Sequence, residues 1–557
     1  MFFIMEKNYK KILVTSALTY ANGYTHLGHI AGSLLPADIY VRFQRLLGRD
    51  VLYICGSDEH GTAIEMSAIK ENITPKEIID KYHKSNKKAY YDLGMSFDIY
   101  SRTSTDVHRA TSQDFFMNLY NKDLLYTKTE KQLYSEKEKR FLADRFVIGT
   151  CPVCGFEEAT GDECENCGSS LTPLELKNPR SKITGDTPVV KESNHFYFPL
   201  SKYQQSLETW QGTKNNWKPN VINYCAGWFK KGLQDRAITR DLDWGVPVPV
   251  EGYDEKVLYV WFDAPIGYIS ATKELFIERN NPDGWKDYWY NGETKLVHFL
   301  GKDNIIFHAI FFPAMLMAHG DFVLADNVPA NEFMNLEGSK LSKRRGNIIY
   351  VKDAVEKINP DTIRYTIASN MPENRDTDFY WSDLQAKNNN ELGAILGNFI
   401  NRTFVFANKY FDGTIPPQNE LQDIDTNIKL RLNSGLEKIE ADYENYKFKD
   451  AVTDSMNIVR DANKYFNDTE PWKAVKENKE RCETIINICL QLVHSFAVIF
   501  HPVLPFSTEK ILHMLNKGKE DLSWDKAGDF VLKPGHRLNQ PEILFNKIED
   551  SEIEKLS

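Results

Sequence analysis

Two histidines three residues apart are the first candidates for chemistry in this sequence. His26 and His29 stand where a β-branched apolar run, residues 11–15, gives way through a loop to an apolar-periodic helix from about His29. Both imidazoles can then face one anion at a helix N-terminus, which carries partial positive charge, and Gly28 lets a ligand approach the backbone. The arrangement suits a triphosphate, although a His-x-x-His pair by itself is equally compatible with a metal pair or with surface histidines.

A glycine-flanked basic segment lies much further along the chain. Residues 335–347 read N-L-E-G-S-K-L-S-K-R-R-G-N and contain Lys340 and Lys343. Two lysines on a loop can stabilise the negative charge that develops on a departing pyrophosphate. A Lys/Arg run alone is more often a solvated surface, but the two motifs in this order, with alternating strands and helices between them, are hard to explain by chance.

Four cysteines form the pattern of a metal site. Two C-x-x-C pairs are separated by nine residues, and a glycine follows each pair; the cysteines are Cys151, Cys154, Cys164 and Cys167. This spacing is typical of a four-thiolate zinc site, and a redox pair or a disulfide knot is the weaker alternative. Four thiolates leave no open coordination position, so the sequence predicts one Zn²⁺ with a structural role.

The segments around these motifs predict how they are positioned. After the first strand, residues 51–55 form a second apolar run, followed by a turn at 56–58 and a helix from about residue 61. Strand patterns return at 256–260 and 295–300, and from about residue 388 apolar residues recur only at helical spacing. We therefore predict an α/β fold: a Rossmann-type parallel-sheet catalytic domain, split by a zinc-containing insertion and followed by an all-α helical bundle.

The 557 residues are too many for a single hydrophobic core. The predicted ranges are the first half of the catalytic domain at 1–119, the insertion at 120–235 with its zinc knuckle at about 145–175, the second half at 236–325, a region with the basic motif at 326–387, and the helical domain at 388–557.

Charge and hydropathy limit the partners. A formal net charge of −10 argues against long-range attraction to nucleic acid, so any RNA contact must be local. The apolar opening, residues 1–5, is too short for a signal-peptide core, and later apolar runs are shorter than the ~20 residues that cross a bilayer. We expect a cytoplasmic protein with no membrane partner.

The H-L-G-H segment at 26–29 and the K-L-S-K-R segment at 340–344 resemble the H-I-G-H and K-M-S-K-S signatures of class I aminoacyl-tRNA synthetases. The resemblance implies that ATP and an amino acid form an aminoacyl-adenylate and pyrophosphate, and that the aminoacyl group passes to the 3′ end of a tRNA. It implies catalytic roles for His26, His29, Lys340 and Lys343. The implied ATP ligands, with Mg²⁺ accompanying the nucleotide, are Asn22, Gly23, His26, Gly28, His29, Gly301, Asp303 and Lys343.

Residues 16–20, 261–268 and 301–308 resemble the methionine pocket of methionyl-tRNA synthetases. A thioether packs well against aromatic rings, and a hydroxyl with an imidazole can contact it without a charge. Trp261 and Tyr268 could also be ordinary core aromatics, but the turn expected at residues 263–265, Asp-Ala-Pro, at the end of a strand favours a pocket. The resemblance implies that Asp58 holds the α-amino group and that the side chain is enclosed by Leu18, Tyr20, Trp261, Ala264, Pro265, Tyr268 and His308. Asn304 and Phe312 stand where some relatives have an aliphatic residue and a tryptophan.

The same resemblance assigns the rest of the chain. The cysteine cluster is similar to the single-zinc form of the connective insertion, and residues 326–387 would contact the tRNA stem. The helical domain would read the CAU anticodon through Asn398, Arg402 and Trp472, which in isolation look like helix surface and a buried turn.

The implied partners are ATP, L-methionine and tRNA(Met), including the initiator, for a chain that is a monomer as given or a homodimer if a C-terminal domain was removed. The alternatives are a synthetase of the same class for leucine, isoleucine, valine or cysteine, and an RNA-binding protein that has lost catalysis.

Overall fold

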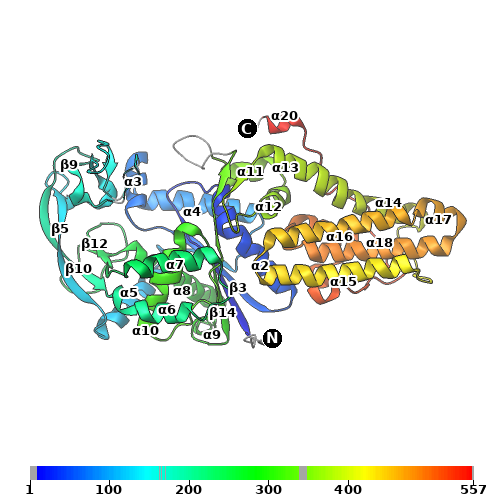
Figure 1. Ribbon diagram of the computed structural model, residues 1–557, viewed down its shortest axis with the longest axis horizontal. Helices are drawn as coiled ribbons and strands as arrows, with labels where there is room; N and C mark the ends of the chain where they lie inside the picture. The colour runs from blue at the N-terminus through cyan, green and yellow to red at the C-terminus, as the bar shows by residue number, and fades with distance from the viewer. Residues whose placement is uncertain are drawn as a thin grey trace.

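The structure is a computed structural model that describes residues 9–337 and 348–554, except Asp162, Glu163, Glu165, Gly168 and Ser170. Three parts follow one another along its longest axis (Figure 1): a β-rich insertion at one end, a sheet with helices on both faces in the middle, and a helical bundle at the other end. The order of these parts agrees with the predicted fold class.

The central sheet is parallel throughout. β1 (Lys11–Ser16) pairs with β3 (Asp50–Asp58) on one side and with β14 (Thr294–Gly301) on the other, and Lys11 lies opposite both Asp50 and Thr294. The outer strands are β2 (Thr19–Tyr20) and β4 (Ile99–Arg102) beside β3, and β15 (Ala330–Asn331) beside β14. The strand order therefore reverses at β1, and open α/β sheets bind ligands at the carboxyl ends of the strands at such a point.

Successive residues of the central strands pack on opposite faces of the sheet. On β1, Ile12 and Val14 lie in one hydrophobic core and Leu13 lies in the other. Helices beside the sheet whose residues join the first core include α2 (Leu35–Leu46) and α4 (Pro75–Asp92), and those of the second include α5 (Asp106–Asn121), α8 (Val260–Glu278) and α10 (Phe312–His319). Because both faces are buried, these strands appear in the sequence as continuous apolar runs.

Three local predictions near the site are wrong. Residues 56–58, predicted as a turn, continue β3, because the end of this strand pairs with β4. Residues 256–260, predicted as a strand of the main sheet, contain only β13 (Val257–Leu258), which pairs with β12 (Thr239–Arg240) outside it. The Asp-Ala-Pro segment at 263–265 lies inside α8, not in a turn, since packing of this helix in the second core outweighs the local preference of proline.

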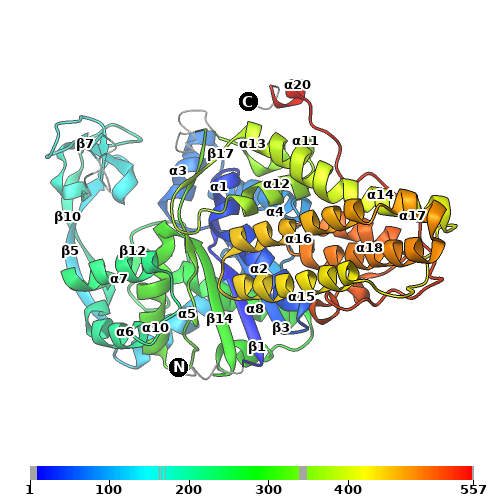
Figure 2. The same cartoon turned by 45° about the vertical axis from the view of Figure 1, so that its right-hand side comes forward.

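The insertion projects from the sheet on a long antiparallel pair, β5 (Tyr126–Ser135) and β10 (Val189–Phe198). The cysteine cluster lies at the outer end of this pair, in a small sheet of β7 (Val147–Thr150), β8 (Ala159–Thr160) and β9 (Lys177–Ser181) (Figure 2). The remaining elements of this half of the chain are α3 (Thr62–Glu71), β6 (Arg140–Phe141), α6 (Gln204–Gln211), α7 (Pro219–Lys231), β11 (Arg236–Ala237) and α9 (Lys286–Trp289).

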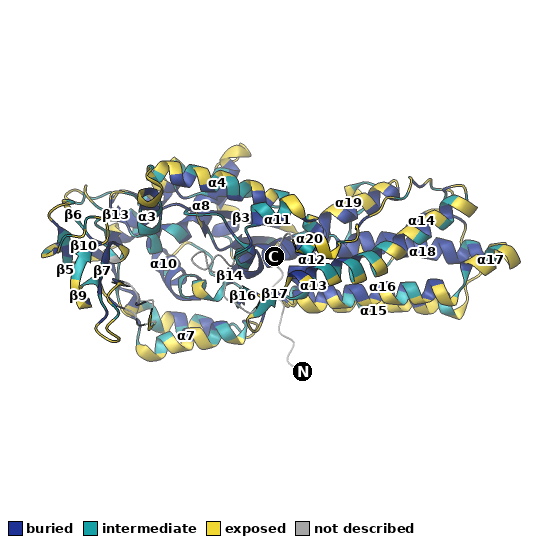
Figure 3. Cartoon of the chain, turned by 90° about the horizontal axis from the view of Figure 1, so that it is seen from above, coloured by how far each residue is buried: buried dark blue, intermediate teal, exposed yellow. Residues whose placement is uncertain are grey.

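The outer helices of the bundle bury one face and expose the other, around one helix that is buried along most of its length (Figure 3). Its long helices are α14 (Asn398–Tyr410), α15 (Asp423–Glu444), α16 (Phe448–Asp468) and α18 (Lys479–Phe500), with α17 (Pro471–Glu477) at the outer end. The helix α19 (Pro505–Met514) packs against α18. Among the described helices, α18 alone is long and apolar enough to cross a membrane, but 94% of its most apolar stretch is buried inside the protein, as in a core helix.

Short elements connect the sheet to the bundle. They are β16 (Met334–Leu336), α11 (Val351–Lys357), α12 (Pro360–Ser369), β17 (Thr377–Phe379), α13 (Trp381–Ala386) and the π-helical η7 (Lys387–Gly397), and the short helix α20 (Asp550–Ile553) lies near the end of the chain.

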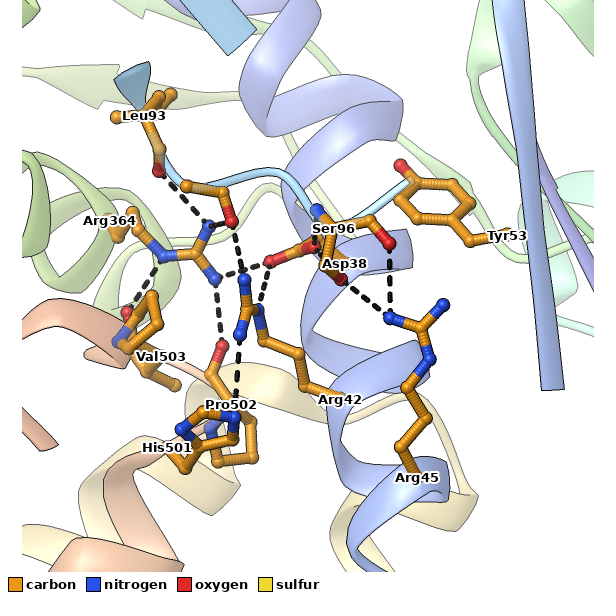
Figure 4. A network of polar contacts seen from close by, with 12 residues as sticks. Asp38, Arg42, Arg45, Tyr53, Leu93, Ser96, Arg364, His501, Pro502 and Val503 are labelled. Carbon is orange, nitrogen blue, oxygen red and sulfur yellow. Dashed lines mark hydrogen bonds and ion pairs between the residues drawn. The ribbon is translucent and has the colours of Figure 1, made fainter. Parts of the chain in front are cut away.

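A buried ion pair joins the sheet helices to the bundle (Figure 4). The Arg364 guanidinium, on α12, donates to Asp38 on α2 at 2.6 Å and to the main-chain carbonyls of Pro502 and Val503, which follow α18, at 2.8 and 2.9 Å. Burial opposes the charge on Asp38, but Arg42 and Arg364 outweigh this effect and lower the pKa of the carboxyl well below its usual range. The junction is therefore an ionised, fully hydrogen-bonded contact between the two parts.

Candidate active site

The two predicted histidines lie at the start of a continuous helical run. His26 is the N-cap of α1 (Leu27–His29), and α1 continues through the π-helical η1 (Ile30–Leu34) into α2. The Gly28 N–H donates to Nδ1 of His26 at 3.1 Å, and the His26 N–H donates to Nδ1 of His29 at 3.2 Å. Because Nδ1 accepts in both rings, the proton of each neutral imidazole sits on Nε2, which is the donor side toward an anion.

The chain that follows the basic motif runs beside these histidines. Lys340 and Lys343 lie outside the described residues. Directly after the motif, the Ile349 carbonyl accepts from the Leu27 N–H at 3.1 Å, and the Val351 N–H donates to the Thr25 carbonyl at 3.0 Å. Tyr350 forms a β-bridge with His26. The H-L-G-H segment and residues 349–351, which follow the basic motif, are thus neighbours, although more than 300 residues separate them in the chain.

The other predicted nucleotide ligands lie on segments that the fold fixes. The carbonyl of Asn22 accepts from Ser67 Oγ at 3.4 Å, and that of Gly23 accepts from Asn86 Nδ2 at 3.1 Å, so the loop before the histidines is tied to α3 and α4. Gly301 ends β14 and Asp303 follows it in a short 3₁₀ turn. Gly301 packs against η1, since a Cβ placed on Gly32 would lie 3.9 Å from its Cα.

A cavity with about 450 Å³ of empty space, solvent at its mouth included, opens beside these segments. All eight residues predicted to bind methionine line it: Leu18, Tyr20, Asp58, Trp261, Ala264, Pro265, Tyr268 and His308. Val260, Asn304 and Phe307 complete the lining and were not predicted to bind methionine. Asn304 and Phe312 are the two positions at which the sequence differs from some relatives. Asn304 lines the cavity, whereas Phe312 packs near Tyr268, with ring centroids 6.3 Å apart. Trp261 and Tyr268 therefore border a cavity as well as the core.

The polar end of this cavity is neutral. The Tyr268 hydroxyl lies 2.8 Å from Nε2 of His308, and Nδ1 of His308 lies 3.0 Å from the Asn304 carbonyl. Burial lowers the pKa of His308 to about 4, so the ring is uncharged near pH 7. A neutral imidazole must then donate from Nδ1 to the carbonyl and accept at Nε2 from the tyrosine, which leaves no full charge facing an apolar side chain.

A carboxylate lies on the same cavity wall. Asp58, the last residue of β3, is buried, and its pKa is raised well above the usual range by burial and by the nearby charge of Asp263. Such a carboxylate gains most from a cationic ligand, since an ammonium supplies a counter-charge that none of the described neighbours of Asp58 provides.

The predicted RNA-contacting residues lie near the outer end of the bundle, and we call them the bundle tip: Asn398, Arg402 and Trp472. Arg402 donates to Asn463 at 3.2 Å and to Asn467 at 3.3 Å, and its guanidinium lies 4.4 Å from the Phe466 ring centre. The indole of Trp472 is 43% exposed, not buried in a turn, and also packs near Phe466. Asn398 is exposed one helical turn before Arg402.

The four predicted metal ligands come together in the insertion. Sγ of Cys151 lies 3.9 Å from Sγ of Cys167, Sγ of Cys154 lies 3.5 Å from Sγ of Cys164, and all four sulfurs lie within 4.8 Å of one another. A tetrahedral ion with Zn–S bonds of about 2.3 Å separates its sulfurs by roughly 3.8 Å. A hydrogen bond from Asn166 lowers the pKa of Cys154 to about 6, which favours the thiolate. The cluster fits a four-thiolate metal site, as the sequence predicts.

Comparison with known proteins agrees with this geometry. A family model described as "tRNA synthetases class I (M)" matches residues 12–404, and one described as "Anticodon binding domain of methionyl tRNA ligase" matches residues 415–557. A methionine–tRNA ligase of Bacteroides fragilis (strain YCH46) is 51% identical over 554 residues, covering 99% of this chain and 81% of the relative. A methionine–tRNA ligase of Porphyromonas gingivalis (strain ATCC 33277) is 50% identical over 555 residues, with the same coverage.

A solved structure extends the comparison to three dimensions. It is that of Mycobacterium tuberculosis methionyl-tRNA synthetase in complex with methionyl-adenylate, which superposes with a TM-score of 0.79 at 26% identity, covering 96% of this chain and 99% of that one. The chain belongs to the methionyl-tRNA synthetase family of class I aminoacyl-tRNA synthetases.

Proposed function

We propose that this chain activates L-methionine with ATP in the cavity beside β1 and β14 and then transfers it to tRNA(Met), including the initiator, in the cytoplasm. The observation that supports this proposal best is the lining of the cavity. Eight residues drawn from four separate segments of the chain, each matched to the methionine pocket of the family, border a single space.

Methionine binds through opposite kinds of contact at its two ends. Asp58 pairs with the α-ammonium, and desolvation makes this ion pair selective for an amino acid. The thioether packs against Trp261 and Tyr268, while the neutral pair of Tyr268 and His308 contacts the sulfur without demanding a charge. Leucine, isoleucine and valine present no such sulfur, and their branched chains differ in shape from an unbranched one.

Adenylate formation is a displacement at phosphorus. An oxygen of the methionine carboxylate forms a bond to the α-phosphorus of ATP, the bond from this phosphorus to the bridging oxygen breaks, and pyrophosphate leaves with that electron pair. The Nε2–H groups of His26 and His29 hold the phosphates, and Lys340 and Lys343 stabilise the charge on the leaving group. Mg²⁺ bound with ATP would neutralise charge on the outer phosphates.

The transfer step joins the other parts of the molecule. The terminal ribose hydroxyl of the tRNA attacks the carbonyl carbon of the adenylate, and AMP leaves. We assign residues 326–387 to contact with the tRNA stem and the bundle tip to the CAU anticodon, where the exposed indole of Trp472 offers a stacking surface for an unpaired base. The four cysteines hold one Zn²⁺ that stabilises the fold of the knuckle, because a closed thiolate set leaves no position for a substrate.

The decisive experiment is amino-acid-dependent ATP–pyrophosphate exchange with methionine, leucine, isoleucine, valine and cysteine tested singly. We expect exchange with methionine alone, and exchange driven by another member of the panel would overturn the assignment. Lys343→Ala should lower the methionine-dependent rate by ~10²-fold or more, since a leaving-group contact is lost. Lys409→Ala, which removes an exposed lysine on α14, is the matched control and should retain the full rate.

A further inference from the structure

A buried triad beside the methionine cavity has no part in the mechanism above. Asp263 and His108 are fully buried and His60 is 6% exposed. Nδ1 of His60 lies 2.6 Å from Oδ2 of Asp263, and Nε2 of His108 lies 3.5 Å from the same oxygen. The Ser270 hydroxyl supports the outer histidine, 2.9 Å from Nδ1 of His108.

The triad connects the elements that form the cavity wall. His60 follows β3 by two residues, so it belongs to the segment that carries Asp58, and its N–H points at Oδ1 of Asp58 from 3.5 Å. Asp263 lies in the first turn of α8, directly before the cavity residues Ala264 and Pro265. His108 comes from the first turn of α5, which packs against α8. The carboxylate of Asp263 therefore holds together three elements that are remote in the sequence.

Hydrogen bonding describes this cluster better than metal coordination does. The three candidate ligand atoms lie within 4.8 Å of one another. However, two ligands of one zinc ion, each about 2.0 Å from it, stay roughly 3 Å apart, and the 2.6 Å between His60 and Asp263 is instead the length of a short hydrogen bond. The other oxygen of Asp263, Oδ1, is buried without a hydrogen-bond partner among the described residues.

The charge of Asp263 also affects the ionisation of Asp58. The titratable groups that act on Asp58 are Asp263 from α8 and Glu59 from its own strand end, and Asp58 in turn acts on Tyr20 and Tyr268. Burial opposes ionisation of Asp263, but His60 and His108 outweigh it and lower the pKa of this carboxyl. Asp263, next to the lining residue Ala264 and kept ionised by the two histidines, thus opposes the ionisation of Asp58, which lines the cavity itself.

We propose that Asp263, held between His60 and His108, is a positioning residue for methionine: it fixes the first turn of α8 against the strand end that carries Asp58, and it adds a second negative charge toward the substrate ammonium. This inference rests on the proposed function, because it takes Asp58 as the ammonium ligand. The ammonium relieves the repulsion between the two carboxylates, so binding of methionine and ionisation of Asp58 are coupled.

The test is the affinity of the full-length protein for methionine as a function of pH, measured by calorimetry without ATP, together with the KM and kcat of exchange. Asp263→Asn keeps the shape and removes the charge. We expect the Kd and KM for methionine to rise about tenfold near pH 7.5 while kcat falls less than about threefold. The loss of methionine affinity at acid pH should also occur about one pH unit lower in the variant, because Asp58 loses a negative neighbour and its pKa falls.

Three controls decide between outcomes. Asp361→Asn removes another buried carboxylate, at the junction with α19, and should leave methionine affinity unchanged. Ser270→Ala removes the contact with Nδ1 of His108, together with a hydrogen bond to the Gly267 carbonyl inside α8, and leaves Asp263 in place. It should raise the Kd two- to threefold, so it provides the decisive result if Asp263→Asn does not fold. If the wild-type protein binds no methionine, the proposed function itself is refuted. If the wild-type protein binds methionine, and Asp263→Asn binds it with the same affinity and loses that affinity at the same acid pH, this inference alone is refuted.

Discussion

The methionine cavity and the bundle tip both contain aromatic side chains, but those at the polar end of the cavity are buried and the indole at the tip is exposed. In the cavity, Tyr268 and His308 are 1% and 5% exposed, and at the bundle tip Trp472 is 43% exposed. The cavity residues come from segments up to about 290 positions apart that the parallel sheet brings together, whereas the tip residues lie on α14 and α17, close to the end of α16. An enclosed site excludes water around a small ligand, and an exposed ring is open to a base that arrives from solution.

This difference implies that the two regions can be damaged separately. A substitution in the cavity should impair methionine activation and, through it, every later step. A substitution at the bundle tip should impair only the step that uses tRNA. The following predictions test that separation, and the first has the largest expected effect.

Replacing Asp58 by Asn should abolish most methionine activation. The ammonium would enter a buried cavity without a counter-charge, and breaking a buried ion pair costs about 3–5 kcal/mol, or roughly 150- to 5,000-fold in kcat/KM. Pyrophosphate exchange measures this loss, and thermal unfolding of the same variant should show an intact fold. Near-normal exchange in Asp58→Asn would mean that another group binds the ammonium.

Replacing Arg364 by Met should weaken the connection between the two regions. The change leaves Asp38 buried with only Arg42 as a charged partner and removes the donors to the carbonyls of Pro502 and Val503. We expect about 3–5 kcal/mol of lost stability against denaturant. Charging of tRNA should also suffer more than pyrophosphate exchange, and an equal loss in both assays would indicate general destabilisation instead.

Replacing Trp472 by Ala should leave exchange unchanged and slow tRNA charging. Loss of base stacking costs about 1–3 kcal/mol, so kcat/KM for tRNA should fall roughly 5- to 150-fold. Trp472→Phe retains a ring and should retain part of the activity. A parallel loss of exchange in Trp472→Ala would contradict the separation of the two regions.

One buried histidine in the cavity and another in the bundle, outside the tip, predict acid sensitivity of the fold. Burial lowers the pKa of His308 in the cavity and of His494 in α18 to about 4 each. The pKa of a histidine in the unfolded chain is about 6.5, so the unfolded state takes up protons first as the pH falls. Folding stability is therefore unaffected by these rings above about pH 6.5 and decreases as the pH falls from there toward 4. His494→Leu should therefore recover roughly 2 kcal/mol relative to the wild type at pH 5 and nothing at pH 8, as measured by denaturant unfolding at the two pH values.

Much of this architecture could be predicted from local sequence because the central strands are buried on both faces. Residues 11–15, 51–55 and 295–300 are apolar runs, and all three are strands of the sheet. The cysteine spacing likewise predicted a cluster that the fold assembles. In these segments, local preference and tertiary environment favour the same structure.

The failures occur where tertiary packing outweighs local preference. The β-branched residues before Trp261 favour a strand and Pro265 favours a turn, yet most of this segment lies in α8 because its apolar face fills the second core. The triad of His60, His108 and Asp263 carries no local signal, since 203 residues separate the two hydrogen-bonded members. From the sequence alone, Asp263 is recognisable only as an acidic residue without an assigned role inside residues 261–268, the segment predicted to bind methionine.

The junction in Figure 4 has a mechanical consequence for the whole molecule. The helical run that begins at His26 also contains Asp38, and Arg364 clamps this residue to the chain directly after α18, the central rod of the bundle. Bending between the bundle and this helical run would break the buried ion pair, at a cost of about 3–5 kcal/mol. We therefore expect the proposed phosphate-binding and anticodon-binding sites to keep a nearly constant separation, so that the protein would test the dimensions of a transfer RNA as well as its bases.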